Sequence, residues 1–111
     1  MDLKNFDISN GEAGIELTIL DLNNNPTDIK IKLLCLHGKK GRAALINSVK
    51  NEKADTAHIL AALTTGWSGL TEGGKELKFS PEAAEKLYGD YPIIAAQVEK
   101  FVEDARNFLK K

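Results

Sequence analysis

One cysteine and two histidines are the residues of this chain best suited to metal binding or nucleophilic chemistry. Cys35 and His37 are spaced to share one face of a strand, whereas His58 lies 21 positions beyond His37. A zinc site takes three or four protein ligands, and no second Cys or His pair completes this set. We therefore expect no metal, no cofactor and no catalytic residue. Cys35 is expected in the core and His37 at a strand end.

Paired carboxylates such as Glu103 and Asp104 are the remaining groups that could perform acid–base catalysis. They lie in polar sequence, which favours a solvated surface. The chain is not expected to be an enzyme.

A basic, glycine-bounded loop is the next feature with chemical potential. Gly38 and Gly41 enclose Lys39 and Lys40, and Arg42 follows, where a strand is expected to lead into a helix. Free main-chain amides at a helix start attract anions. A nucleotide-binding loop, however, needs Gly, four residues and then Gly-Lys-Ser/Thr, and this loop lacks both that spacing and the hydroxyl. A basic docking patch is the more specific interpretation of this loop.

Charge is unevenly distributed along a chain whose net charge is only −1. Residues 1–29 hold one base and six acids, residues 30–53 seven bases and one acid, and residues 54–111 seven bases and nine acids. The first two segments, at −5 and +6, could complement one another within the molecule, or the middle one could form a docking patch.

A small nucleic-acid-binding protein that uses the basic segment 30–53 is an alternative. None of the chain's aromatic residues lies in that segment, so a platform for stacking bases is missing. The phosphate contacts would be Lys30, Lys32, Lys39, Lys40, Arg42, Lys50 and Lys53.

The first half of the chain predicts a β-hairpin. Apolar and polar residues alternate over 15–19 and again over 29–35, which is typical of strands with one buried face. Residues 23–28 combine asparagines with a proline and predict the turn. Residues 9–14 are expected to form a loop.

Helical spacing follows the basic loop. Apolar residues between 44 and 63 fit one interrupted helix or, as we favour, two, with Asp55 or a neighbour capping the second. Trp67 is expected to end the helical pattern, and 67–79 to form a loop or short hairpin. Ser80 and Pro81 start the next helix, which is expected to stop at Gly89.

The last helix is expected to start at Asp90-Tyr91-Pro92 and to continue almost to the end of the chain. Lys110 and Lys111 would lie near its negative end. A single apolar stripe runs along it: Ile94, Val98, Phe101, Val102, Ala105, Phe108 and Leu109.

These elements predict an α+β fold, with an N-terminal antiparallel β-hairpin followed by a mostly helical part of about four helices. The 111 residues predict a single domain: 1–37 the hairpin region, 38–66 the basic loop and helices, 67–79 the loop or short hairpin, and 80–111 two C-terminal helices. No apolar run approaches the roughly 18 residues that span a bilayer, and the start of the chain lacks the pattern of a signal peptide. A cytosolic protein without a membrane partner is expected.

Ordered stretches of the second half resemble the tail assembly chaperones of long-tailed, siphophage-type bacteriophages. The first half is compatible with that family but carries no landmark of it. The resemblance rests on residues 63–69 (LTTGWSG), 74–84 (GKELKFSPEAA), 87–101 (LYGDYPIIAAQVEKF) and 104–109 (DARNFL). The fold landmarks within them are Trp67, Phe79, Ser80, Pro81 and Pro92.

The resemblance implies a non-enzymatic factor that binds and solubilises the long, mostly helical tape measure protein and helps to recruit the tail tube (major tail) protein. It implies a place in the host cell cytoplasm and absence from the mature virion. In many relatives a programmed frameshift yields a longer product, which would recruit the tail tube protein; this chain resembles the short product. A structural head–tail connector is a further alternative.

For the partner surface we expect helix-in-groove or helix-on-helix contacts of modest affinity, repeated by many copies. Self-association is a further expectation. The candidate binding residues are Lys39, Lys40 and Arg42 of the basic loop, with Phe101, Phe108 and Leu109 of the last stripe. Trp67 is expected to fill the junction between hairpin and helices, Phe79 to seat the following helix, and Pro92 to set the corner into the last one.

Overall fold

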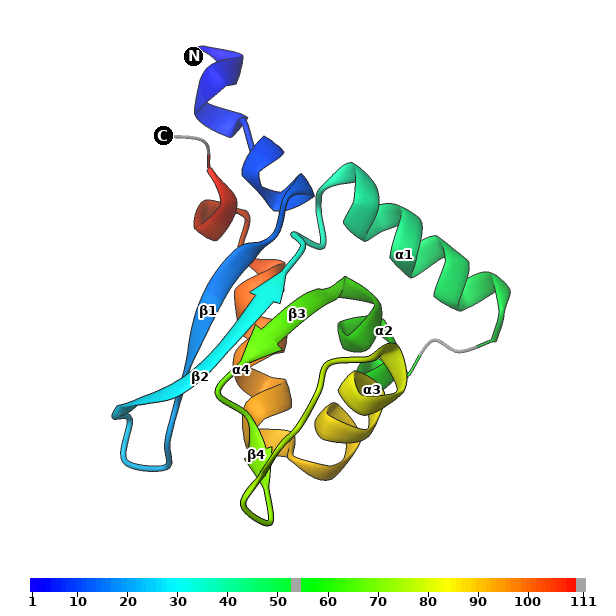
Figure 1. Ribbon diagram of the computed structural model, residues 1–111. Helices are drawn as coiled ribbons and strands as arrows, with labels where there is room; N and C mark the ends of the chain where they lie inside the picture. Colours follow the sequence, from blue (N-terminus) through cyan, green and yellow to red (C-terminus); the bar gives the residue numbers. More distant parts are fainter. Residues whose placement is uncertain (53–54, 110–111) are drawn as a thin grey trace.

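A three-stranded antiparallel sheet forms one layer of the computed structural model, which describes residues 1–52 and 55–109 (Figure 1). Its strands β1 (Ile15–Leu20), β2 (Pro26–Leu33) and β3 (Thr64–Ser68) lie in the order β1-β2-β3. The α+β class and the N-terminal hairpin are confirmed, and β3 is a strand that the sequence analysis missed. The predictions for Lys53 and for Lys110 and Lys111 lie outside the described residues.

The hairpin has the predicted face and part of the predicted turn. Leu17 lies opposite Ile31, and both pack toward the core. Of the predicted turn 23–28, residues 23–25 lie in the connection, where the Asp21 carboxylate accepts hydrogen bonds from the main-chain N–H groups of Asn23 and Asn25. Strand pairing therefore already resumes at Pro26.

The third strand follows the second helix, α2 (Thr56–Leu63), without a loop. The Thr64 hydroxyl donates to the main-chain carbonyl of Leu60 at 2.8 Å and lies 2.6 Å from the Tyr88 hydroxyl. Burial raises the pKa of Tyr88 to about 12. The expectation that Trp67 ends a helix is wrong, because Trp67 lies in β3 opposite Ile31.

Trp67 joins the sheet to the segment that follows it. Its ring meets Phe79 edge-on, with centroids 5.0 Å apart, and its Nε1 donates to the main-chain carbonyl of Leu77 at 2.8 Å. Within this segment β4 (Thr71–Glu72) and β5 (Lys75–Glu76) pair as a short hairpin, which is one of the two forms predicted for 67–79.

Separate helices α1 (Lys39–Lys50) and α2 confirm the favoured interpretation of the middle segment. Asp55 is at the N-cap of α2, but its side chain makes no capping hydrogen bond. None of the helices in the described part of the chain is long and apolar enough to cross a membrane.

The start of α3 (Pro81–Asp90) follows the prediction, since the Ser80 hydroxyl accepts from the main-chain N–H of Ala83 at 3.0 Å. Its end does not, because α3 continues past Gly89 to Asp90. The expected start of the last helix at Asp90-Tyr91-Pro92 is confirmed: Pro92 begins α4 (Pro92–Glu103), whose N-cap residue Tyr91 makes no side-chain capping hydrogen bond.

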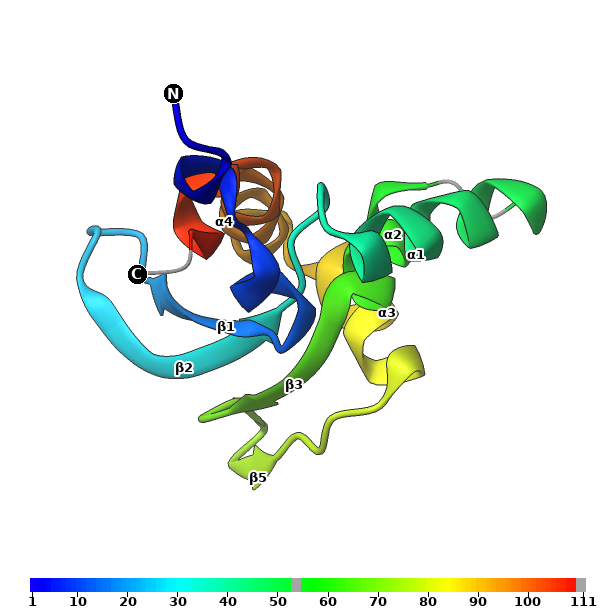
Figure 2. The ribbon, with the colours of Figure 1, turned by 90° about the horizontal axis from the view of Figure 1, so that it is seen from above.

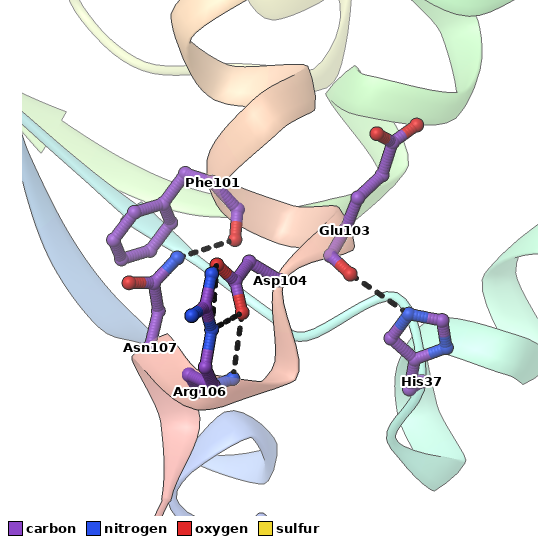
Figure 3. A network of polar contacts seen from close by, with 6 residues as sticks. All are labelled: His37, Phe101, Glu103, Asp104, Arg106 and Asn107. Carbon is purple, nitrogen blue, oxygen red and sulfur yellow. Dashed lines mark hydrogen bonds and ion pairs between the residues drawn. The ribbon is translucent and has the colours of Figure 1, made fainter.

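The last helix is shorter than the apolar stripe suggested. After Glu103, the Asp104 carboxylate accepts hydrogen bonds from the main-chain N–H of Arg106 at 3.0 Å and from its guanidinium at 2.7 Å (Figure 3). The side-chain hydrogen bond from Arg106 lowers the pKa of Asp104 from 3.8 to about 2. Asp104 thereby ends α4 and caps a separate 3-10 helix, Ala105–Phe108.

The core lies between the sheet and the helices α2, α3 and α4, whereas α1 projects away from this body in both ribbon views (Figures 1 and 2). The core residues from these elements are Ile19, Ile31, Leu33, Leu60, Leu63, Leu87, Tyr88, Val98 and Val102.

Helix α1 crosses the chain that leaves β2 at Gly41. This glycine is buried, and a Cβ placed on it would collide with the main-chain carbonyl of Cys35. The close crossing fixes the position of the first turns of α1.

Two helical glycines therefore predict opposite results when changed to alanine. Gly41→Ala should lower the free energy of unfolding by about 1–3 kcal/mol, because the added methyl group has no space. Gly89→Ala in α3, where a Cβ meets nothing within 4 Å, should raise it by about 0.5–1 kcal/mol. Urea denaturation of both variants tests this, and a loss of stability in Gly89→Ala would contradict it.

Candidate functional site

The predicted basic residues Lys39, Lys40 and Arg42 lie exposed on the first turn of α1. The main-chain amides of this turn meet a carboxylate of the chain itself. Glu12 accepts from Lys39 N at 2.6 Å and from Lys40 N at 3.3 Å, while Lys40 Nζ donates to the Glu12 carbonyl at 3.2 Å. The amides that an anionic ligand would need are thus engaged by Glu12.

Part of the acidic and basic segregation is intramolecular. Besides Glu12 at α1, Glu16 of β1 pairs in register with Lys32 of β2, and Lys30 Nζ donates to the Thr18 hydroxyl at 2.7 Å. The basic residues of 30–53 therefore divide between β2 and α1. Within the described residues the ion pairs lie elsewhere, at His58–Glu85 and Asp104–Arg106, so the bases of α1 take part in none of them.

The second group of candidates, Phe101, Phe108 and Leu109, is not an exposed stripe. Phe108 is fully buried and meets Phe101 edge-on, with ring centroids 5.2 Å apart, while Phe101 and Leu109 are half-buried. Because the 3-10 helix turns back after Asp104, it carries Phe108 inward. Phe108 belongs to the interior, and a Phe108→Asp change would test the core.

His37 stands near this C-terminal turn and outside any strand. Its Nε2 donates to the main-chain carbonyl of Glu103 at 2.9 Å (Figure 3). Cys35 is buried as a free thiol, and His58 lies on α2 beside Glu85. The part of the chain that the structure describes contains no group of three or more Cys, His, Asp or Glu placed to hold a metal ion.

An apolar hollow of about 150 Å³ opens between α1, α2 and α4. Next to it on α1, Ile46 and Val49 remain 55% and 58% exposed. Val49 follows the lining residue Leu45 by one helical turn, so the hollow continues as an apolar stripe along α1. We name this surface the α1 groove: Leu36, Leu45, Ile46, Val49, Thr56, Ile59, Leu60, Leu63, Glu99, Val102 and Glu103.

A second apolar hollow, of about 210 Å³, lies beside the β4–β5 hairpin and is lined by Leu70, Leu77 and Leu87 among others. There the hairpin itself forms one side, together with Tyr91. The α1 groove differs because it continues onto a helix that projects from the body (Figure 2).

The α1 groove does not follow from the sequence, for a definable reason. Helical spacing alone places Ala44, Leu45 and Val49 on one face, yet only Ala44 and Leu45 are half-buried and Val49 is exposed. The available signal was Ile46, an apolar residue beside that stripe on a helix otherwise bounded by basic residues.

The fold and the site define an α+β domain with an apolar groove beside a cationic helix. Comparisons with protein-family models, curated proteins and solved structures find no match.

Glu12 is predicted to hold α1 in place. Glu12→Ala leaves two amides of the first turn without their carboxylate acceptor and should lower the free energy of unfolding by about 1–2 kcal/mol. Glu76→Ala, which removes an exposed carboxylate on β5, should change it by less than about 0.5 kcal/mol. Urea denaturation measures both, and equal effects would rule out the capping role.

Proposed function

We propose that this chain is a phage tail assembly chaperone, which binds and solubilises the tape measure protein and helps to recruit the tail tube protein. The observation that carries this proposal is the α1 groove, an open apolar surface on a projecting helix. The groove suits an amphipathic helix, because such a partner inserts side chains spaced by three or four residues. The tape measure protein would supply many such helices.

The contacts available in the groove support modest affinity per copy. Full burial of a Val or Ile side chain contributes about 1.5–3 kcal/mol, and both Ile46 and Val49 are already about half covered. Together they would add about 2–3 kcal/mol to binding. Many copies along one long partner would then supply the strength that a single copy lacks.

The proposal also covers location and further partners. The protein would act in the host cytoplasm and be absent from the mature virion. Recruitment of the tail tube protein would involve a longer, frameshifted product, as the resemblance implies.

Polar substitution of the exposed α1 residues tests the proposal. Ile46→Gln with Val49→Gln should greatly reduce the amount of soluble tape measure protein on co-expression, because the groove loses its apolar rim. Gln favours helix and both sites are exposed, so the thermal midpoint should change little. The matched control is Leu22→Gln, at an apolar residue that is 81% exposed in the hairpin turn. Solubilisation lost equally in both would contradict a role for the groove.

The composition of purified phage particles separates the competing functions. A chaperone should be absent from particles by mass spectrometry, whereas a head–tail connector should be present in stoichiometric amount. A nucleic-acid-binding protein would instead show an affinity for DNA that falls by orders of magnitude between low and moderate salt. Either of the latter results would overturn the proposal.

A further inference from the structure

The two sides of the α1 groove carry opposite charge. Helix α1 has no acidic residue between its ends, and Arg42 and Lys50 lie one helical turn before and after the exposed Ile46. Lys39 and Arg42 also line a separate hollow, against the N-terminal segment that holds Asp7 and Glu12. On the α4 side, Glu99 and Glu103 line the hollow of the α1 groove. An apolar surface is thus bordered by cations along α1 and by carboxylates along α4.

Except for Lys40, whose Nζ donates to the Glu12 main-chain carbonyl, these charges are available to a partner. The ion pairs of the described residues are His58–Glu85 and Asp104–Arg106, so neither the bases of α1 nor the two glutamates of the groove are engaged in one. Figure 3 shows the Glu103 carboxylate turned away from His37 and from the Asp104–Arg106 pair. Only the main-chain carbonyl of Glu103 takes part in that network.

We propose that the α1 groove binds an amphipathic partner helix with carboxylates on one flank of its apolar stripe and lysines or arginines on the other. The acidic flank faces α1, and the basic flank faces Glu99 and Glu103. This inference rests on the proposed function and names the kind of tape measure segment that the groove selects. Because the two flanks differ, the groove also fixes the direction in which the helix lies.

A second copy of the chain is the nearest other occupant, and it fits only one side of the groove. Its helix α1 offers the exposed Ile46 and Val49 and could place cations against Glu99 and Glu103. It carries no carboxylate for the cations of α1, whereas a partner helix with charges of both signs satisfies both sides.

Three synthetic helical peptides test this rule against the intact protein by fluorescence anisotropy at low salt. All share one apolar stripe of about five turns. One has glutamates on one flank and lysines on the other, one has glutamates on both flanks, and one has lysines on both. The wild-type chain should bind the mixed peptide about threefold to tenfold more tightly than either of the others, since each surface ion pair adds little.

Charge reversal on the α4 side should change that order. Glu99→Lys with Glu103→Lys makes both sides cationic and should make the all-acidic peptide the tightest ligand. Glu76→Lys with Asp90→Lys changes the net charge equally at exposed sites away from the groove and should leave the mixed peptide first. Comparable thermal midpoints establish that both variants are folded.

Several results would overturn the proposal: no peptide binds, the order survives reversal of Glu99 and Glu103, or the control variant shifts it equally. A dimer that dissociates on Ile46→Gln with Val49→Gln would assign the groove to a second copy instead. If the peptides bind in the expected order but the tape measure protein is not solubilised, the preference for a partner with both charges stands and the chaperone function is contradicted. If the tape measure protein is solubilised but the peptides do not bind in that order, the chaperone function stands and the charge preference is contradicted.

Discussion

The central strand β2 is the constraint on which the other elements depend. It is hydrogen-bonded to a neighbour on each side, and its residues Ile31 and Leu33 are fully buried. The chain leaving it stays inside: Leu34 N donates to the Leu63 carbonyl at 2.8 Å, and Leu36 N to the Val102 carbonyl at 3.1 Å. These two main-chain hydrogen bonds fasten the ends of α2 and α4 to one extended segment. Displacing β2 would therefore disturb sheet and helices together.

The same segment explains why α1 stands where it does. After the buried Cys35 the chain turns at Gly38, and α1 then crosses the segment that it has just left. This crossing requires a glycine at position 41, because a Cβ there would collide with the main-chain carbonyl of Cys35. Glu12 then secures the first turn. The contacts of α1 are thus concentrated at its start, while Ile46 and Val49 farther along remain exposed. A helix anchored in this way leaves a groove beside it, because the body covers only part of its apolar surface.

Elements governed by local chemistry could be predicted from the sequence, and elements governed by long-range pairing could not. Alternation over 15–19 and 29–35 predicted the hairpin face, and the Ser80-Pro81 pair predicted the start of α3. Thr64, Thr65 and Trp67 individually favour a strand, but no alternation of apolar and polar residues marks Thr64–Ser68 as one, and the segment is held by pairing with β2 more than thirty residues earlier. Likewise, the spacing that joined Phe108 to the stripe of α4 is interrupted by Asp104, whose side chain competes for main-chain hydrogen bonds. The basic residues of the site could be predicted from their charge. The groove could not, because it exists only through the position of α1 relative to α2 and α4.

The position of α1 as a projecting helix gives a structural reason for the separation of acidic and basic residues along the sequence. The acidic first segment lies beside the basic middle one at two places, where the Glu12 carboxylate accepts from the main-chain amide of Lys39 and where Glu16 lies opposite Lys32 in the sheet. The side chains of Lys39, Arg42 and Lys50 are left without ion pairs among the described residues, beside exposed isoleucine and valine. An exposed apolar stripe on a small domain invites pairing with its own copies, and a single sign of charge along that stripe opposes it. The like charge that opposes direct pairing of two α1 helices would, on the function proposed above, attract a partner whose carboxylates flank its apolar face. The same cations would then act against one contact and in favour of another, because both effects follow from the sign of the charge along α1.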